Sequence, residues 1–378
     1  MKLGLHPSRQ GIALIIVMIA VVTLSIMVGG FAYSMKVETT LARNSSMDSE
    51  MEWMGRSGIE LAKWALCQPK TSGIQYDALN QEWAGGTGDT NRLPLPEGNT
   101  LEDYWLDQRH TRRISVKIED LERKWNINTM KTLKAMPIPN APDVLGQALF
   151  LYAGLDAAEK DTVENAILAW MDPSTTGIRD TGDSYYMSLD PPYRAKKGPL
   201  DDITELMMIR YITPPMFYGT GRSAQYSRGP THQPGLGRSA LDEPTYPVGL
   251  VDLFTTLSSG KVNINTASAE VLQCLPGLDD GPVQAIIAHR LGPEDPSEPT
   301  PFKHPFVGPG DLMAVAQTAP ELQPLLPVLQ QYWGLLFTGV STTFDVRVEA
   351  SIGGYKRTYH GVVRRQGNNA QTLFMYWD

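Results

Sequence analysis

The longest apolar run of the chain lies near its start, from Ile12 to about Tyr33, and only Thr23 and Ser25 carry polar side chains within it. At a helical rise of about 1.5 Å per residue, its roughly 22 residues extend over about 33 Å, which matches the hydrocarbon core of a bilayer. A cleaved secretory signal peptide has an apolar stretch of only about 7 to 15 residues, with a small-residue site after it. The run therefore predicts a membrane-spanning helix over residues 12–33.

The helical pattern continues past the membrane length. Apolar or small residues recur at spacings of three and four between Met47 and Ala65, which predicts that the same helix runs on over residues 34–66 with one face toward a packed body. Gln68-Pro69 is expected to end it. The alternative is a membrane helix joined to a separate amphipathic helix, with a break near Gly29-Gly30.

Alternating apolar and polar positions predict strands at two distant places, residues 114–118 and residues 344–352. After the second, Gly353-Gly354 predicts a turn, followed by strands over residues 355–364 and 372–377. We expect these strands to form one antiparallel sheet. The roughly two hundred residues between β-rich segments then form a helical insertion within a small sheet domain.

The insertion carries an internal repeat: the segment from Lys124 to Thr129, Lys-Trp-Asn-Ile-Asn-Thr, returns at residues 261–266 as Lys-Val-Asn-Ile-Asn-Thr. Each copy precedes a helical stretch, and Thr129 and Thr266 are predicted to be helix N-caps. The second copy continues as a helix-hairpin-helix pattern, which in other proteins presents backbone donors to DNA phosphates. Here the hairpin, residues 277–281, is Gly-Leu-Asp-Asp-Gly, and its two carboxylates favour a packing role without nucleic acid.

The composition and charge of the chain limit the classes of function that it can have. With 378 residues, 42% of them hydrophobic, the chain is long enough for two or three domains with cores of their own, and its net charge of −8 disfavours a nucleic-acid surface. The basic residues Lys2 and Arg9 precede the membrane helix, which predicts a cytoplasmic leader and a body outside the inner membrane. Cys67 and Cys274 are expected to be two separate thiols.

Catalytic motifs do not occur in the sequence. Residues 213–247 are rich in Gly, Pro, Ser and Tyr and read as a loop. The Gly-x-Gly segments at Gly219 and Gly235 follow no strand pattern and open no periodic helix, so they do not predict a dinucleotide site. We expect neither an enzyme nor an organic cofactor.

The order of a basic leader, Gly11 and a spanning helix resembles the N-termini of type IV pilins and pseudopilins. The resemblance implies that a prepilin peptidase cuts between Gly11 and Ile12. The fifth mature position, usually Glu in this class, is Ile16. Such a Glu is thought to pair with the amino terminus of a neighbouring subunit, since a carboxylate in lipid is costly without a partner. A subunit with Ile16 offers no such pairing to a subunit above it.

As a whole the chain resembles the K-type minor pseudopilins of the type II secretion system. The resemblance rests on the leader without Glu, the two Asn-Ile-Asn-Thr segments, and residues 169–172, 183–188, 191–193 and 202–206. It implies an α+β, pilin-like fold: a long N-terminal transmembrane helix and a small antiparallel sheet, interrupted by a large all-α insertion of two SAM-like, helix-hairpin-helix subdomains. The implied parts are the leader 1–11, the helix halves 12–33 and 34–66, the first sheet part 67–128, the helical domains 129–262 and 263–330, and the closing strands 331–378.

This resemblance also implies a function. The chain would sit at the tip of the pseudopilus, initiating or capping its assembly for export of folded proteins from the periplasm across the outer membrane. Its partners would be other minor pseudopilins, the major pseudopilin, the prepilin peptidase and the inner membrane. The alternative is a minor pilin of a type IV pilus, and a more distant one is a membrane-tethered helix-hairpin-helix DNA receptor.

One candidate ligand site remains, for calcium. Asp172, Asp180 and Asp183 fall within a short polar stretch with two glycines, and calcium selects carboxylate and carbonyl oxygens. The family resemblance implies calcium in the helical domain and carries over Asp172 and Asp183 as ligands. The chain departs from the family pattern at Gly182, where the family tends to have Glu, and Asp180 is the candidate to supply the missing oxygen. The other reading is an acidic solvated loop.

Overall fold

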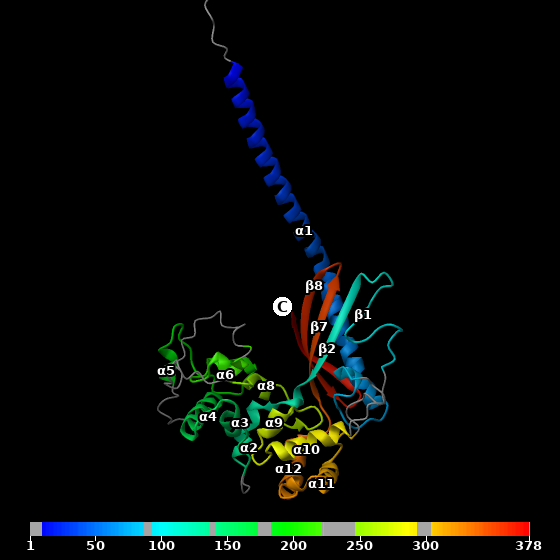
Figure 1. Ribbon diagram of the computed structural model, residues 1–378, viewed down its shortest axis with the longest axis vertical. Coiled ribbons are helices and arrows are strands. Elements are labelled where there is room, and N and C mark those ends of the chain that lie inside the picture. The colour runs from blue at the N-terminus through cyan, green and yellow to red at the C-terminus, as the bar shows by residue number, and fades with distance from the viewer. Residues whose placement is uncertain are drawn as a thin grey trace, which may run out of the picture.

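The computed structural model describes residues 10–86, 93–136, 141–172, 183–220, 222, 246–292 and 304–377. Its first element is a single 62-residue helix, α1 (Gln10–Thr71). Figure 1 shows the first half of α1 standing clear of the body and the second half lying along the sheet. The helix does not break at Gly29-Gly30, so the prediction of one continuous helix is confirmed.

The predicted end of α1 at Gln68-Pro69 is wrong by about one turn, since the helix continues to Thr71. Pro69 lacks only the amide that would bond to the carbonyl four residues earlier, and the last turn tolerates this loss. The bond from Ser72 N to Gln68 O, at 3.0 Å, is kept, and Thr71 Oγ1 donates to Cys67 O.

Five antiparallel strands form the main sheet in the order β1-β2-β7-β8-β9. They are β1 (Tyr104–Trp105), β2 (Arg112–Asp120), β7 (Thr343–Ile352), β8 (Tyr355–Gln366) and β9 (Asn369–Trp377). Gly353 and Gly354 form the turn between β7 and β8, both with positive φ, which glycine adopts without strain. β2 pairs along its whole length with β7, so the insertion separates two neighbouring strands. The predicted strands and the α+β class are confirmed.

Two glycines bring α1 close to this sheet. A Cβ atom at Gly55 would lie 2.5 Å from the Tyr359 ring, and one at Gly58 would lie 2.4 Å from Val348 Cγ1. Buried side chains from α1, β2, β7 and β8 form the core beneath this contact. A side chain of the sheet occupies the space that a Cβ atom would need at each glycine, so the second half of α1 packs closely against the sheet.

The insertion between β2 and β7 is mainly helical, and it lies at the end of the sheet farthest from the free half of α1 (Figure 1). Its longer helices are α3 (Val144–Tyr152), α4 (Ala157–Met171), α10 (Asp280–Leu291), α11 (Pro309–Thr318) and α12 (Leu326–Leu336). Its shorter helices are α2 (Met130–Lys134), α5 (Asp183–Met187), α6 (Pro214–Tyr218), α8 (Leu250–Leu253) and α9 (Ala269–Gln273). It also contains the 3-10 helices η2 (Leu121–Arg123), η3 (Ile127–Thr129), η4 (Ile203–Met208) and η5 (Pro320–Leu322). A further 3-10 helix, η1 (Glu82–Ala84), lies outside the insertion, before β1.

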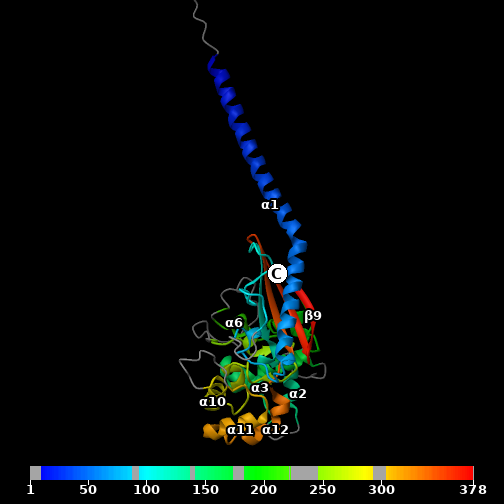
Figure 2. The ribbon, with the colours of Figure 1, turned by 90° about the vertical axis from the view of Figure 1, so that its right-hand side faces the viewer.

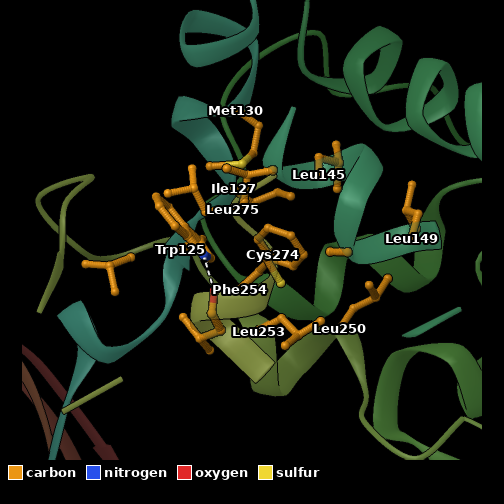
Figure 3. Close-up of a cluster of buried hydrophobic side chains, with 14 of the residues drawn as sticks. Trp125, Ile127, Met130, Leu145, Leu149, Leu250, Leu253, Phe254, Cys274 and Leu275 are labelled. Atoms are coloured by element: carbon orange, nitrogen blue, oxygen red, sulfur yellow. Dashed lines mark hydrogen bonds between the residues drawn. The ribbon is translucent and has the colours of Figure 1, made fainter. Parts of the chain in front are cut away.

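One hydrophobic core runs through both halves of the insertion. Trp125 lies at its centre, fully buried, and donates from Nε1 to the carbonyl oxygen of Val271 at 2.7 Å. Figure 3 shows Trp125, Ile127, Leu145 and Phe254, which precede the predicted boundary, packing with Cys274, which follows it. The core is therefore continuous across the predicted boundary between residues 262 and 263. Cys67 and Cys274 are free thiols, as predicted.

The two copies of the sequence repeat adopt the same local structure. The first includes β3 (Trp125–Asn126), which pairs in parallel with β4 (Phe254–Thr255). The second includes β5 (Val262–Asn263), which pairs in parallel with β6 (Phe337–Thr338). In each copy the second Asn holds a distant backbone with two hydrogen bonds: Asn128 holds Leu200 at 2.8 and 3.0 Å, and Asn265 holds Phe306 at 2.7 and 2.9 Å.

The predicted N-cap position is confirmed at Thr129 and wrong at Thr266, and neither hydroxyl makes a capping bond. Thr129 precedes α2, but its hydroxyl donates to Asn126 O instead of accepting a backbone N–H. Thr266 lies outside α9, whose N-cap is Ser268. Its hydroxyl donates to the buried carboxyl group of Asp120, at the end of β2, at 2.5 Å.

Candidate functional site

The N-terminal segment keeps the features of a membrane anchor. Within the described residues, one helix, starting at Ala13, is long and apolar enough to cross a bilayer, and its most apolar window has no surface buried in the body. Gly11 and Ile12 lie in the first turn of α1, although their side chains and residues 1–9 are outside the described part. Ile16 is 61% exposed and faces no other part of the body. This apolar surface is therefore not explained by a core.

Exposed apolar side chains continue beyond the membrane length. Trp53 of α1 is 64% exposed, with the Arg56 guanidinium 5.2 Å from its ring centroid. At the sheet edge, β9 exposes Leu373, Phe374, Tyr376 and Trp377, and it carries no charged residue from end to end. Figure 2 shows β9 at the side of the sheet, next to α1. An uncharged, exposed edge strand is a surface at which another chain can pack.

The calcium candidates fall mostly outside the described residues. Asp180 is not described, and neither is the side chain of Asp183, which opens α5. Asp172 follows α4, is 7% exposed, and accepts a hydrogen bond from the ammonium group of Lys131. In the described part of the chain, no group of three or more His, Cys, Asp or Glu side chains could hold a metal ion.

Asp172 therefore does not fit a cation in this arrangement. A calcium ion on its carboxylate would meet the positive charge of Lys131, and the ammonium would have to leave. Nearby, Lys134 pairs with the buried Glu164, whose carboxyl pKa is raised by burial, and with Asp143 at 3.3 Å. Calcium stays a prediction, tested below.

The predicted hairpin, residues 277–281, connects α9 and α10. Leu278 is buried within it, while Asp279 and Asp280 are exposed, and Asp280 accepts a hydrogen bond from Gln273. Two exposed carboxylates at this place would repel a phosphate backbone. The absence of nucleic acid among the partners stays a prediction.

The sequence analysis missed a buried polar cluster where the sheet meets the insertion, which we call the joint. Its members are Asp77, Asp120, Glu122, Asn263, Thr266, Ser341 and Arg365, and none is more than 2% exposed. Arg365 donates to Asp77, to Ser341 O at 2.7 Å and to Leu66 O at 2.7 Å. The joint thus connects the end of α1, the sheet and the second repeat.

A second sequence repeat could have pointed to the joint. Phe254-Thr255 followed by Ser258 returns as Phe337-Thr338 followed by Ser341. Each Phe-Thr pair is the parallel partner of one Asn-Ile-Asn-Thr segment. In each copy the first Asn bonds to the Ser: Asn126 Nδ2 donates to Ser258 O, and Asn263 Nδ2 donates to Ser341 Oγ, both at 2.7 Å.

Two parts of the chain match models of a known protein family. Residues 123–218 match one model described as type II secretion system, protein K, and residues 262–303 match a second with the same description. Each match begins at or next to one copy of the Asn-Ile-Asn-Thr repeat. Both parts of the insertion are therefore similar to protein K of the type II secretion system. These matches support a minor pseudopilin of that system, as the sequence resemblance indicated.

A solved structure has a similar fold. It is a chain of the GspK–GspI–GspJ complex from the type 2 secretion system of enterotoxigenic Escherichia coli, with a TM-score of 0.54 and 17% sequence identity. The alignment covers 89% of the present chain and 99% of the other, so the likeness extends over helix, sheet and insertion. No curated protein sequence matches at a significant level.

Proposed function

We propose that this chain is a non-enzymatic tip subunit of the type II secretion pseudopilus, where it initiates or caps assembly. The observation that carries the proposal is the placement of the helical insertion at the end of the molecule farthest from the free half of α1 (Figure 1). A subunit built this way places its bulk where a subunit stacked above it would have to lie. Ile16 supports the same role, because it cannot accept the amino terminus of such a subunit.

The anchor defines the location that we propose. The apolar half of α1 holds the chain in the inner membrane, with the body in the periplasm, after a prepilin peptidase has cut between Gly11 and Ile12. The basic leader on the cytoplasmic side supports this orientation. The cut leaves the spanning helix intact, so the mature chain remains anchored until it enters the pseudopilus.

The partners that we propose are other minor pseudopilins and, below them, the major pseudopilin. The similar solved structure is of a GspK–GspI–GspJ complex, which supports a tip complex of this kind. Trp53 and the aromatic residues of β9 are exposed surfaces that a partner with the same long helix would cover. Burial of a large aromatic side chain is worth about 1.5 to 3 kcal/mol, so these residues would contribute much of the affinity.

Co-purification tests the proposal. A tagged chain, extracted from its own host in mild detergent, should retain other minor pseudopilins, and its deletion should stop protein export through the outer membrane. Trp53→Glu should reduce the retained partners at least tenfold, while Asp201→Lys, a change at a site with an 89% exposed side chain, should not. Normal export in the deletion strain together with loss of pili and twitching would favour the type IV pilus alternative.

A further inference from the structure

The joint holds more buried carboxylates than cations. Asp77 pairs with Arg365, and Lys70 Nζ lies 3.4 Å from the same carboxylate. Among the described residues, no Lys, Arg or His forms an ion pair with Asp120 or Glu122. With every group ionised, the cluster of three carboxylates and two cations would carry one uncompensated negative charge in a closed environment, which is costly.

Glu122 is held by four hydrogen bonds. Its carboxylate accepts hydrogen bonds from the backbone N–H groups of Ser259, Thr342 and Thr343 at 2.9 to 3.1 Å, and from Thr342 Oγ1 at 2.7 Å. Asp120 accepts as many hydrogen bonds, because the N–H of Glu122 donates to its Oδ1 at 2.8 Å. Two of the donors to Asp120 are hydroxyls, which can also accept, whereas three of the donors to Glu122 are backbone N–H groups, which cannot. Asp120 is therefore the carboxyl whose surroundings can accommodate a proton.

Asp120 is the point at which the sheet holds the insertion. Its Oδ2 accepts from Ser341 Oγ at 2.6 Å, from Thr266 Oγ1 at 2.5 Å and from Asn263 Nδ2 at 3.3 Å. Thr266 Oγ1 also lies 3.4 Å from Asn263 O. The Thr266 hydroxyl can therefore donate to this carbonyl and accept a hydrogen bond from the O–H of a protonated Asp120, so the same contacts accommodate a neutral carboxylic acid.

We propose that Asp120 is a proton-dependent latch: in its protonated form it holds the second repeat to the sheet, and in its ionised form it loosens that contact. The physical cause is the like charge of Glu122, which follows two residues later, and that of Asp77. Ionisation would place a third negative charge in the joint without a third cation. The helical insertion would then be held less rigidly against the sheet.

The electrostatic environment of Asp120 agrees with this. Burial, and next the negative charge of Glu122, raise the pKa of Asp120 to about 7, while the hydroxyls of Ser341 and Thr266 act in the opposite direction. Asp120 also lines a cavity of about 410 Å³. The other charged or titratable groups lining it are Lys117, Glu119, Arg123, Asp345, Arg347 and His360.

The sign of the pH effect follows from linkage. The folded protein retains the proton to a higher pH than the unfolded chain, in which an Asp has a pKa of about 4. The stabilisation from the protonated Asp120 is complete below about pH 4, declines as the pH rises from there to about 7, and is lost above it. Hydrogen bonds between the second repeat and the sheet that weaken when Asp120 ionises should weaken over the upper part of this pH range.

Hydrogen exchange of the full chain in detergent, read by mass spectrometry and corrected for intrinsic rates, tests the latch. In the wild type, peptides that contain Asn265 and Thr342 should exchange at least fivefold faster at pH 8.5 than at pH 5.5. Asp120→Asn, which imitates the neutral acid, should remove this dependence, whereas Asp201→Asn should keep it. The same pH dependence in the wild type and in Asp120→Asn would overturn the proposal.

A second variant retains the carboxylate in case Asp120→Asn fails to fold. Ser341→Ala removes a donor that favours the ionised form, so the midpoint of the exchange transition should move to higher pH by at least half a unit. An unchanged midpoint would also overturn the latch. Neither measurement uses export or partner binding, so the result is independent of the proposed tip function.

Discussion

Arg365 of β8 donates a hydrogen bond from Nη1 to the carbonyl oxygen of Leu66 in α1, at 2.7 Å. Both residues are almost fully buried, and the other terminal nitrogen of Arg365 bonds to Asp77 and to Ser341 O. One guanidinium therefore joins the end of the membrane helix to the sheet and to the segment that leads into β7.

Replacing this guanidinium should strongly destabilise the body. Arg365→Ala leaves Asp77 buried with only Lys70 nearby, and breaking a buried ion pair from one side costs about 3 to 5 kcal/mol. We expect a large drop in the thermal midpoint of the detergent-solubilised chain, followed by circular dichroism. Lys356→Ala, which removes an exposed pair with Glu349, should cost less than about 1 kcal/mol. Equal effects of the two changes would contradict the role assigned to Arg365.

Replacing glycine by alanine should change stability in opposite directions at Gly58, which packs against the sheet, and at Gly334, which does not. Gly58→Ala would place a methyl group 2.4 Å from Val348 Cγ1, so the helix must shift, and overpacking of this kind costs about 1 to 3 kcal/mol. Gly334→Ala, on α12 with no atom within 4 Å of the new Cβ, should stabilise the chain by up to about 1 kcal/mol through helix propensity. Thermal unfolding of both variants measures the difference, and stabilisation by Gly58→Ala would show that the contact is looser than described.

Processing depends on the small residue before the cut. Gly11→Val should leave the leader attached and keep the chain out of any fibre, because the peptidase requires a small residue there. Mass spectrometry of the membrane fraction should find Ile12 as the first residue of the wild type and Met1 as that of the variant. A wild-type chain that still begins at Met1 would exclude the pilin-type maturation.

The fifth mature position should accept a carboxylate without a change in the tip complex. Ile16→Glu introduces a group that costs a few kcal/mol in the membrane, which a long apolar helix can tolerate. We expect normal insertion, and partner co-purification within about twofold of the wild type. A loss of tenfold or more would mean that Ile16 itself takes part in assembly.

Calcium binding should raise the thermal midpoint if Asp172, Asp180 and Asp183 converge on one ion, because a ligand that binds the folded state stabilises it. The full chain should then melt at a higher temperature in excess calcium than in chelator, with magnesium a poor substitute. Asp183→Ala should reduce this difference. A wild-type midpoint that calcium leaves unchanged would assign these residues to a solvated loop and Asp172 to its pair with Lys131.

Local patterns in the sequence were sufficient to predict the long apolar N-terminal helix, the β7–β8 hairpin with Gly353-Gly354, and the repeat of Asn-Ile-Asn-Thr. The spacing of apolar residues, a turn and a short motif each depend only on residues that are close in the sequence. The partners of Asp120 could not be predicted in this way, because Thr266 and Ser341 lie more than 140 residues away and meet it only after folding. The prediction of an N-cap at Thr266 was wrong for the same reason, because its hydroxyl bonds to the distant carboxyl group of Asp120 and not to a local backbone amide.

The pairing of β2 with β7 constrains the order in which the chain can fold. Asp120 emerges from synthesis more than two hundred residues before its partner Phe344, so α1 and β2 must wait for the strand that completes their core. Closing such a length of flexible chain is slow, and non-local pairings of this kind delay folding. If the insertion folds first, it brings the end of β2 close to the start of β7 and so shortens the loop between them. The helical domain then acts as a template for the sheet whose strands flank it in the sequence.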